Sequence, residues 1–175
     1  LRGQFRLQKW GLFGWNIHAT TVIASLLMLS LTVKSQTTFS PTELEKLCNY
    51  STQDFESYVL KRGYSLHQNT NYDDGVISTM YFSEERRQYD TPDMMTRTYS
   101  ETFVLLVFAT TSKDYYLGLK QALAEQGYTF QKEYGKDVSG KTCIAYDYGK
   151  REYTVTLYSD TINGITWYTL QIFEV

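Results

Sequence analysis

The feature that most constrains the fold of this 175-residue chain is a sequence pattern that recurs after about 64–65 residues. The matched positions are Gly63-Tyr64-Ser65-Leu66 with Gly127-Tyr128-Thr129-Phe130, Gly75 with Gly140, Tyr81 with Tyr146, Arg86 with Arg151, and 102–108 with 167–173. A nearly constant offset favours an internal duplication. Chance similarity between two halves of the same class is the alternative.

Each repeat is expected to begin with a helix and to continue as antiparallel strands. Ser40-Pro41-Thr42-Glu43 has the residues of a capped helix start, and further starts are predicted at Ser51 and at 111–114. Gly63 and Gly127 can end the helices in a left-handed conformation. The predicted strands are 64–68, 76–83, 97–110 and a weaker one at 86–89, and then 128–134, 141–148, 151–159 and 165–174. This order predicts an α+β fold of two tandem units, 36–110 and 111–175, within one compact domain.

Alternation along the strands assigns their side chains to two faces of the sheet. In the second unit the set expected to pack on the helix is Ile144, Tyr146, Tyr148, Tyr153, Val155, Leu157, Tyr168, Leu170 and Ile172. The opposite set is mostly polar with large aromatic side chains at intervals: Ala145, Asp147, Thr154, Thr156, Tyr158, Trp167, Thr169, Gln171 and Phe173.

In the first unit the same reasoning predicts that both faces of the sheet are apolar. The set expected on the helix is Thr79, Tyr81, Phe103, Leu105 and Val107, and the opposite set is Met80, Phe82, Val104, Leu106 and Phe108. An apolar sheet face must be covered, either by the other repeat or the 84–100 segment, or by a binding partner. The candidate binding residues are Met80, Phe82, Leu106, Phe108, Tyr158, Trp167 and Phe173.

The first 35 residues have the layout of a bacterial secretory signal. Arg2, Arg6 and Lys9 precede an apolar run at 19–33, and Val33-Lys34-Ser35-Gln36 is a candidate cleavage site. Because apolar residues extend the run back to residue 10, an uncleaved membrane anchor at 10–33 is the alternative. The sequence therefore predicts a periplasmic or secreted protein, and an inner-membrane-anchored one as second choice.

Removal of this segment leaves a mildly acidic chain. It takes away Arg2, Arg6, Lys9 and Lys34 from 17 basic residues and none of the 19 acidic ones, so the net charge becomes about −6. Nucleic-acid binding, which needs a basic face, is not expected. All 16 tyrosines are retained, and tyrosine suits both sheets and recognition surfaces.

Two cysteines, Cys48 and Cys143, remain after the signal. In an oxidising compartment they can form a disulfide, and two unpaired buried thiols are the alternative. The sequence does not decide between them, because the distance between the two residues is not known.

The residue pattern gives no sign of catalysis or of a metal or cofactor site. His67 is the only histidine after the signal, and an exposed strand position is the simpler interpretation of it. The 69–75 segment resembles a calcium loop, but its Gly75 is one place late and Met80 stands at the position of the bidentate Glu. An enzyme is therefore the least favoured class, and neither a cofactor nor a metal is expected.

Two tandem units, each with helices followed by an antiparallel sheet, resemble the β-lactamase-inhibitor-like family of exported bacterial proteins. The Gly63-Tyr64 and Gly127-Tyr128 junctions and the strands after them carry this resemblance over about 40–175. The chain departs from the family in having only two cysteines and a shorter repeat. The resemblance implies a non-enzymatic module that binds a protein partner, in the envelope or outside the cell, through an aromatic-rich sheet face. A carrier that holds a small apolar ligand between sheet and helices is the second hypothesis.

Overall fold

The computed structural model describes residues 38–86 and 90–174, which form three helices and an antiparallel sheet of eight strands. In chain order the elements are α2 (Pro41–Cys48), α3 (Thr52–Lys61), β1 (Tyr64–Asn71), β2 (Ile77–Arg86), β3 (Pro92–Tyr99), β4 (Val104–Thr110), α4 (Lys113–Glu125), β5 (Thr129–Val138), β6 (Lys141–Lys150), β7 (Tyr153–Ile162) and β8 (Ile165–Glu174). The predicted α+β class is confirmed. The expected export signal at 1–35 lies outside the described residues, and within them no helix has the length and apolar character needed to cross a bilayer.

Each described helix begins at a serine, as the sequence predicts for α2 and α3. The Ser40 side chain accepts a hydrogen bond from the Glu43 amide, and the Glu43 carboxylate accepts one from the Ser40 amide at 2.9 Å. Ser51 and Ser112 cap α3 and α4 in the same way, with their side chains accepting from Asp54 and Tyr115 amides. Each cap satisfies an amide that the first helical turn leaves without a partner.

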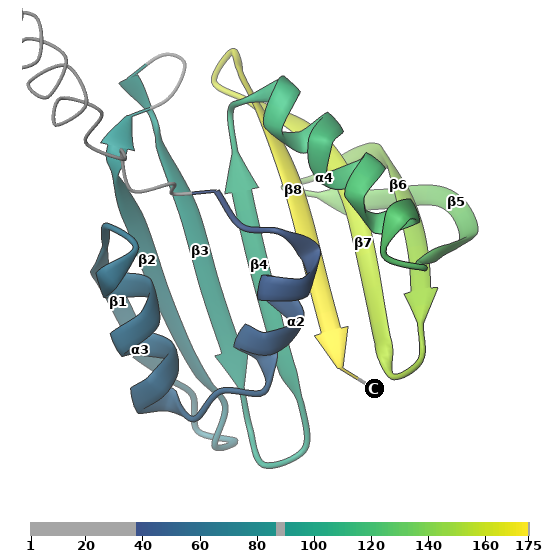
Figure 1. Cartoon of the computed structure of the whole chain (residues 1–175). Coiled ribbons are helices and arrows are strands. Elements are labelled where there is room, and N and C mark those ends of the chain that lie inside the picture. The colour runs from purple at the N-terminus through teal and green to yellow at the C-terminus, as the bar shows by residue number, and fades with distance from the viewer. Residues whose placement is uncertain (1–37, 87–89, 175) are drawn as a thin grey trace, which may run out of the picture. The chain divides into compact units, whose positions relative to one another are not determined.

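The sheet has the strand order β1-β2-β3-β4-β8-β7-β6-β5, and every neighbouring pair is antiparallel. The first four strands therefore form one meander and the last four a second, and the two meanders join where β4 pairs with β8. Figure 1 shows α2, α3 and α4 on the same side of this sheet. One face is thus covered by helices, and we call the opposite one the open face.

The first meander differs from the strand pattern expected of it. The predicted 97–110 strand is two strands, β3 and β4, and the amide of Ser100 donates to the Phe103 carbonyl at 3.0 Å in the turn between them. Of the weaker strand predicted at 86–89, residues 87–89 lie outside the described residues. Pro92 is the first residue of β3, where a missing amide is tolerated.

The core lies between the helices and the helix-covered face. Its members are at most 9% exposed and come from both meanders and from all three helices. The largest of those that are less than 2% exposed are Phe39, Leu44, Leu47, Phe55, Tyr64, Met95, Leu106, Phe108, Leu123, Leu157, Leu170 and Ile172. Burial of each such side chain contributes about 1.5–3 kcal/mol. The helix-facing set expected of the second unit is confirmed, although Ile144 lies beyond helix cover and is 56% exposed.

The prediction of which β4 side chains face the helices is wrong. Leu106 is 0% and Phe108 is 1% exposed, so both point into the core, while Leu105 and Val107 lie on the open face. The expectation transferred faces from 167–173 by matching Phe108 with Phe173, but Phe108 shares its face with Leu170 and Ile172. Because side chains alternate along a strand, this one-residue error exchanges the two faces of the whole strand.

The two cysteines are free thiols in the structure. Cys48 is the last residue of α2 and is buried under it, whereas Cys143 is a half-buried residue of β6 whose thiol contacts the Lys136 carbonyl at 3.4 Å. The sequence leaves open a disulfide or two unpaired buried thiols. The structure has two unpaired thiols, of which only Cys48 is fully buried.

Candidate functional site

The open face carries a broad uncharged area over its central strands. Met80 and Phe82 of β2, Met94 of β3 and Val107 of β4 all lie on it, because directly opposed residues of an antiparallel pair point to the same face. Each of the four is half-buried although no helix covers it. Phe82, Met94 and Ala109 lie directly opposite one another, so they form an apolar row across β2, β3 and β4.

A pocket of about 310 Å³ opens at one end of this row. It is lined by Met94, Val107, Ala109, Val138, Tyr158, Asp160, Ile162, Trp167 and Thr169. The β6–β7 ladder ends at Ala145 and Tyr158, and beyond it the β5–β6 hairpin bends over the open face, which brings Val138 against residues of β4 and β8. A mostly apolar hollow with a few polar groups is the usual form of a binding site.

Five of the seven residues that the sequence selects for binding lie on the open face, and two of these line the pocket. Tyr158 and Trp167 line the pocket, and Phe82 lies directly opposite the pocket residue Met94. Met80 is the next open-face residue of β2, and Phe173, 37% exposed, lies further along β8.

Leu106 and Phe108 are not part of the site, because both belong to the core on the other face.

Several lining residues are missed by sequence reasoning. Val107 is missed because the faces of β4 are exchanged, and alternation in the correct register would have found it. Met94 belongs to a segment interpreted as cover for the face rather than as a strand. Val138 has no local signal, since it reaches the pocket through a hairpin that bends out of the sheet.

Charged groups on the open face are concentrated near β5 and β6. The buried one among them, Asp147, has hydrogen-bond partners and a nearby cation. Asp147, 6% exposed, accepts hydrogen bonds from the Thr156 hydroxyl at 2.7 Å and the Tyr134 hydroxyl at 3.3 Å. Lys132 lies 3.5 Å from the same carboxylate. Asp147 is therefore a structural group rather than a free acid.

At the pocket itself the polar groups are neutral or lie at the rim. Burial raises the pKa of the Tyr158 hydroxyl, which accepts a hydrogen bond from Gln171 Nε2 at 3.2 Å, so this phenol stays protonated at neutral pH. The Asp160 carboxylate accepts from the Thr161 amide at 2.7 Å, and Lys136 Nζ lies 5.4 Å from the Tyr158 ring centre. The arrangement suits recognition of an apolar group with one or two hydrogen bonds.

Two other hollows lie on the helix side, and some of their polar groups pair with one another. The larger, about 430 Å³, lies beside the end of α2, where Lys150 pairs with Glu45 at 2.8 Å and Asn49 donates to the Tyr153 hydroxyl. A second of about 300 Å³ lies beside Tyr115. Paired charges and capped backbone groups of this kind indicate a structural role.

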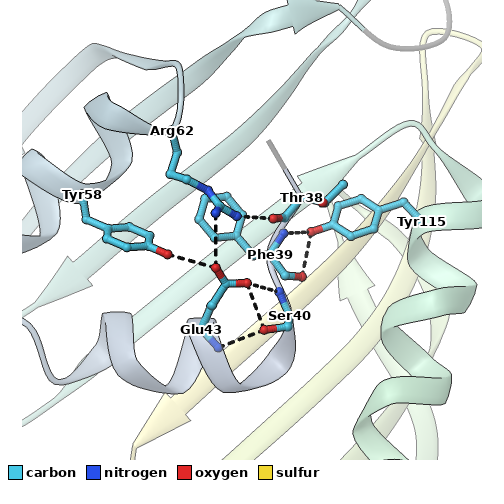
Figure 2. A network of polar contacts seen from close by, with 7 residues as sticks. All are labelled: Thr38, Phe39, Ser40, Glu43, Tyr58, Arg62 and Tyr115. Carbon is cyan, nitrogen blue, oxygen red and sulfur yellow. Dashed lines mark hydrogen bonds and ion pairs between the residues drawn. The ribbon is translucent and has the colours of Figure 1, made fainter. Parts of the chain in front are cut away.

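A polar network holds the segment just before α2, next to that second hollow, and Figure 2 shows its members. Glu43 accepts hydrogen bonds from Ser40 at 2.9 Å and from the Tyr58 hydroxyl at 2.9 Å, and pairs with Arg62 at 3.3 Å.

The same network holds the backbone that precedes α2. Arg62 donates to the Thr38 carbonyl, and the Tyr115 hydroxyl both accepts from the Phe39 amide and donates to the Phe39 carbonyl at 2.9 Å. These contacts tie the backbone at 38–40 to α3 and α4, so we assign the network to stability.

The residues considered for chemistry are not assembled into a reactive site. His67 is exposed on β1, and its ring lies 4.7 Å from the Phe82 ring. Within residues 38–86 and 90–174, no three His, Cys, Asp or Glu side chains are grouped so that they could hold a metal ion.

Comparison of the chain with protein-family models, with curated proteins and with solved structures finds no match. The open face and its pocket are therefore the observations on which a function is argued.

Proposed function

We propose that the chain is an exported, non-enzymatic binding module that receives a protein partner on the open face of its sheet. One observation carries the proposal: an apolar row from β2 to β4 ends in a pocket of about 310 Å³, and no described helix covers this row. Exposed contiguous apolar surface of this kind marks interaction sites in folded proteins.

The pocket supplies the place for an anchor side chain. Trp167 and Tyr158 offer aromatic walls, and the sulfur-containing Met94 can adapt to the shape of a guest. Interfaces obtain most of their affinity from a few side chains buried in pockets, surrounded by contacts that exclude water. An aromatic or branched aliphatic side chain of the partner fits this volume.

We further propose that the two meanders arose by internal duplication. In support, β1 and β5 carry a bulge at the same distance from their Gly-Tyr junctions, at 66–68 and 130–132. Residues in the same ladder position are Leu66 and Phe130, Tyr81 and Tyr148, Met95 and Val155, and Phe108 and Ile172. The hairpins of the two meanders differ in length, so residues at equivalent ladder positions are not separated by a constant number of residues. For this reason the sequence comparison matches Tyr81 with Tyr146, whereas the ladders match Tyr81 with Tyr148.

The register where the two meanders join also favours duplication. Leu106 lies opposite Ile172, and Phe108 lies opposite Leu170. The residue equivalent to Leu106 in the second unit, 64 places later, is Leu170, and the one equivalent to Phe108 is Ile172. Replacing each residue of the first pair by its equivalent therefore gives the second pair. Val107 and Gln171 lie opposite each other at the centre of this relationship. Two copies of one unit that pair their last strands around a two-fold axis give this register.

The proposal follows the expectation drawn from the resemblance to β-lactamase-inhibitor-like proteins, which implies that a sheet face binds a protein. Export through residues 1–35, and with it a location in the periplasm or outside the cell, belongs to the same proposal.

Capture of a partner from envelope extract of the native host tests the proposal. The immobilised protein is compared with Trp167→Asp, which places a charge in the pocket, and with Leu117→Asp on the exposed side of α4, 48% exposed, as matched control. A protein retained by the parent chain and by Leu117→Asp, but lost with Trp167→Asp, would support the proposal. Equal retention by all three chains would contradict it.

A small apolar ligand is the second candidate, and the volume of the pocket favours it. The site lies on the open face and not between sheet and helices, where core side chains fill the space. Native mass spectrometry of the purified chain should then show a bound mass that Val107→Trp removes by filling the pocket. A chain that carries no ligand and does not bind an added hydrophobic dye would exclude the carrier.

A further inference from the structure

The sheet ends in two edge strands, β1 and β5. Among residues 38–86 and 90–174, β1 pairs only with β2 and β5 pairs only with β6, so their outer backbone groups have no partner strand there. Residues 65–69 of β1 are all exposed. An unpaired edge of this kind offers amide and carbonyl groups to any chain that can lie beside it, and natural proteins usually block it with charges.

The two edges differ in this protection. β5 carries four charged residues, Lys132, Glu133, Lys136 and Asp137. β1, with the sequence Tyr-Ser-Leu-His-Gln-Asn-Thr-Asn, carries no Asp, Glu, Lys, Arg or Pro. Both strands have a bulge at the same place, and counted from it Gln68 and Asn69 stand where β5 has Lys132 and Glu133.

We propose that β1 pairs antiparallel with β1 of a second copy of this chain, across a two-fold axis near Asn69. In such a pair each residue near the axis lies opposite the same residue, or a near neighbour of it, in the other copy. A charged residue there would therefore lie close to the same charge in the other copy. β1 avoids this cost, and an axis at Asn69 sets Asn69 opposite Asn69 and Gln68 opposite Thr70. These are short polar side chains that hydrogen-bond across a strand pair.

Two features of the molecule select a second copy as the occupant. The stretch after the bulge, 68–71, pairs regularly with 77–80 of β2, so its outer edge is a regular template. The join between β4 and β8 shows that strands from the two halves of this chain already pair antiparallel without an intervening element. The β1 edge is also separate from the open-face pocket, which involves β3, β4, β5, β7 and β8. Dimer formation and partner capture can therefore fail independently.

Sedimentation equilibrium of the full chain tests the proposal with a pair of complementary variants. The parent chain is expected to be a dimer in reversible equilibrium with monomer. Asn69→Glu and Asn69→Lys, each measured alone, should raise the dimer dissociation constant by at least about fivefold, because like charges face each other across the axis. An equimolar mixture of the two should restore a dissociation constant near that of the parent.

Glu133→Gln, on the opposite edge of the sheet, is the matched control and should leave the dissociation constant unchanged. A parent chain that is monomeric throughout the concentration range would overturn the proposal. So would a dimer that both Asn69 variants leave intact, which would place the contact elsewhere, or a mixture that stays monomeric. Circular dichroism establishes that each variant is folded, as expected for a substitution at an exposed position.

Discussion

Arg97 of β3 donates a hydrogen bond of 2.6 Å from Nη2 to the carbonyl oxygen of Tyr50, in the turn between α2 and α3. The residue is 4% exposed, and its guanidinium carbon lies 5.0 Å from the centre of the Phe55 ring and 4.9 Å from that of the Tyr99 ring. Nε and Nη1 have no hydrogen-bond partner among the described residues. Burial lowers the pKa of Arg97 from its usual value, so this cation is held mainly by aromatic rings and one carbonyl.

Because the charge is incompletely satisfied, the bulk of Arg97 should matter more to stability than its charge. Arg97→Ala and Arg97→Met both remove the donor to the Tyr50 carbonyl, but Arg97→Ala also leaves a cavity and should lower the free energy of unfolding by about 2–4 kcal/mol. Arg97→Met fills most of the volume and should stay within about 1.5 kcal/mol of the parent. Urea unfolding measures both, with exposed Arg86→Ala as control. Equal losses for Met and Ala would show that the charge itself stabilises the fold.

Neighbouring residues of β4 provide a direct test of which side chains are core. Phe108 is 1% exposed and packs on the Tyr115 ring at 5.3 Å and the Phe39 ring at 6.0 Å. Phe108→Ala should therefore cost about 3–5 kcal/mol of unfolding free energy. Val107→Ala, on the open face, should cost less than about 1.5 kcal/mol. The reverse order in thermal or urea unfolding would mean that the faces of β4 are the ones expected from the sequence.

Local signals in the sequence are sufficient for the helix starts and for the faces of the second meander. Ser40 and Ser51 cap helices as predicted, and Gly63 and Gly127 adopt φ of +78° and +82° after α3 and α4. Val155, Leu157, Leu170 and Ile172 are buried on the expected face. Capping and alternation are determined within a few residues, so they can be deduced without the rest of the fold.

The parts of the site that were not predicted depend on register and on contacts distant in sequence. A one-residue difference between matching Phe108 to Phe173 and to Ile172 exchanges the two faces of β4, and low identity between the units gives no means to detect it. Val138 enters the pocket only because the β5–β6 hairpin bends over the sheet, a contact that no local pattern specifies.

The two thiols should differ in reactivity. Burial raises the pKa of Cys48 to about 12, and also raises that of Cys143, although Cys143 is only half-buried. We therefore expect slow alkylation of Cys143 in the native chain and no alkylation of Cys48 until denaturant is added. Peptide mapping after timed alkylation measures this, and Cys143→Ser should abolish native labelling. An intact mass two hydrogens below that of the reduced chain would instead show a disulfide between them.

Glu43 should make the stability of the fold fall in acid. Burial acts to raise the pKa of its carboxyl, but hydrogen bonds from Ser40 and Tyr58, together with Arg62, outweigh burial and hold the pKa below 4.5. A carboxyl with a lowered pKa in the folded state stabilises the protein above pH 4.5, and this stabilisation is lost as the pH falls through the folded-state pKa.

The measurement is urea unfolding of the parent and of Glu43→Gln over a pH series. Glutamine keeps an acceptor for the Ser40 amide but removes the charge that pairs with Arg62, so the variant should be less stable by about 0.5–1.5 kcal/mol at neutral pH. The difference should shrink as the pH falls below the folded-state pKa, where the parent carboxyl is protonated too. Exposed Glu152→Gln is the matched control and should track the parent at every pH. A Glu43→Gln deficit that stays constant down to strongly acidic pH would show that the network stabilises through its geometry and not through the charge of Glu43.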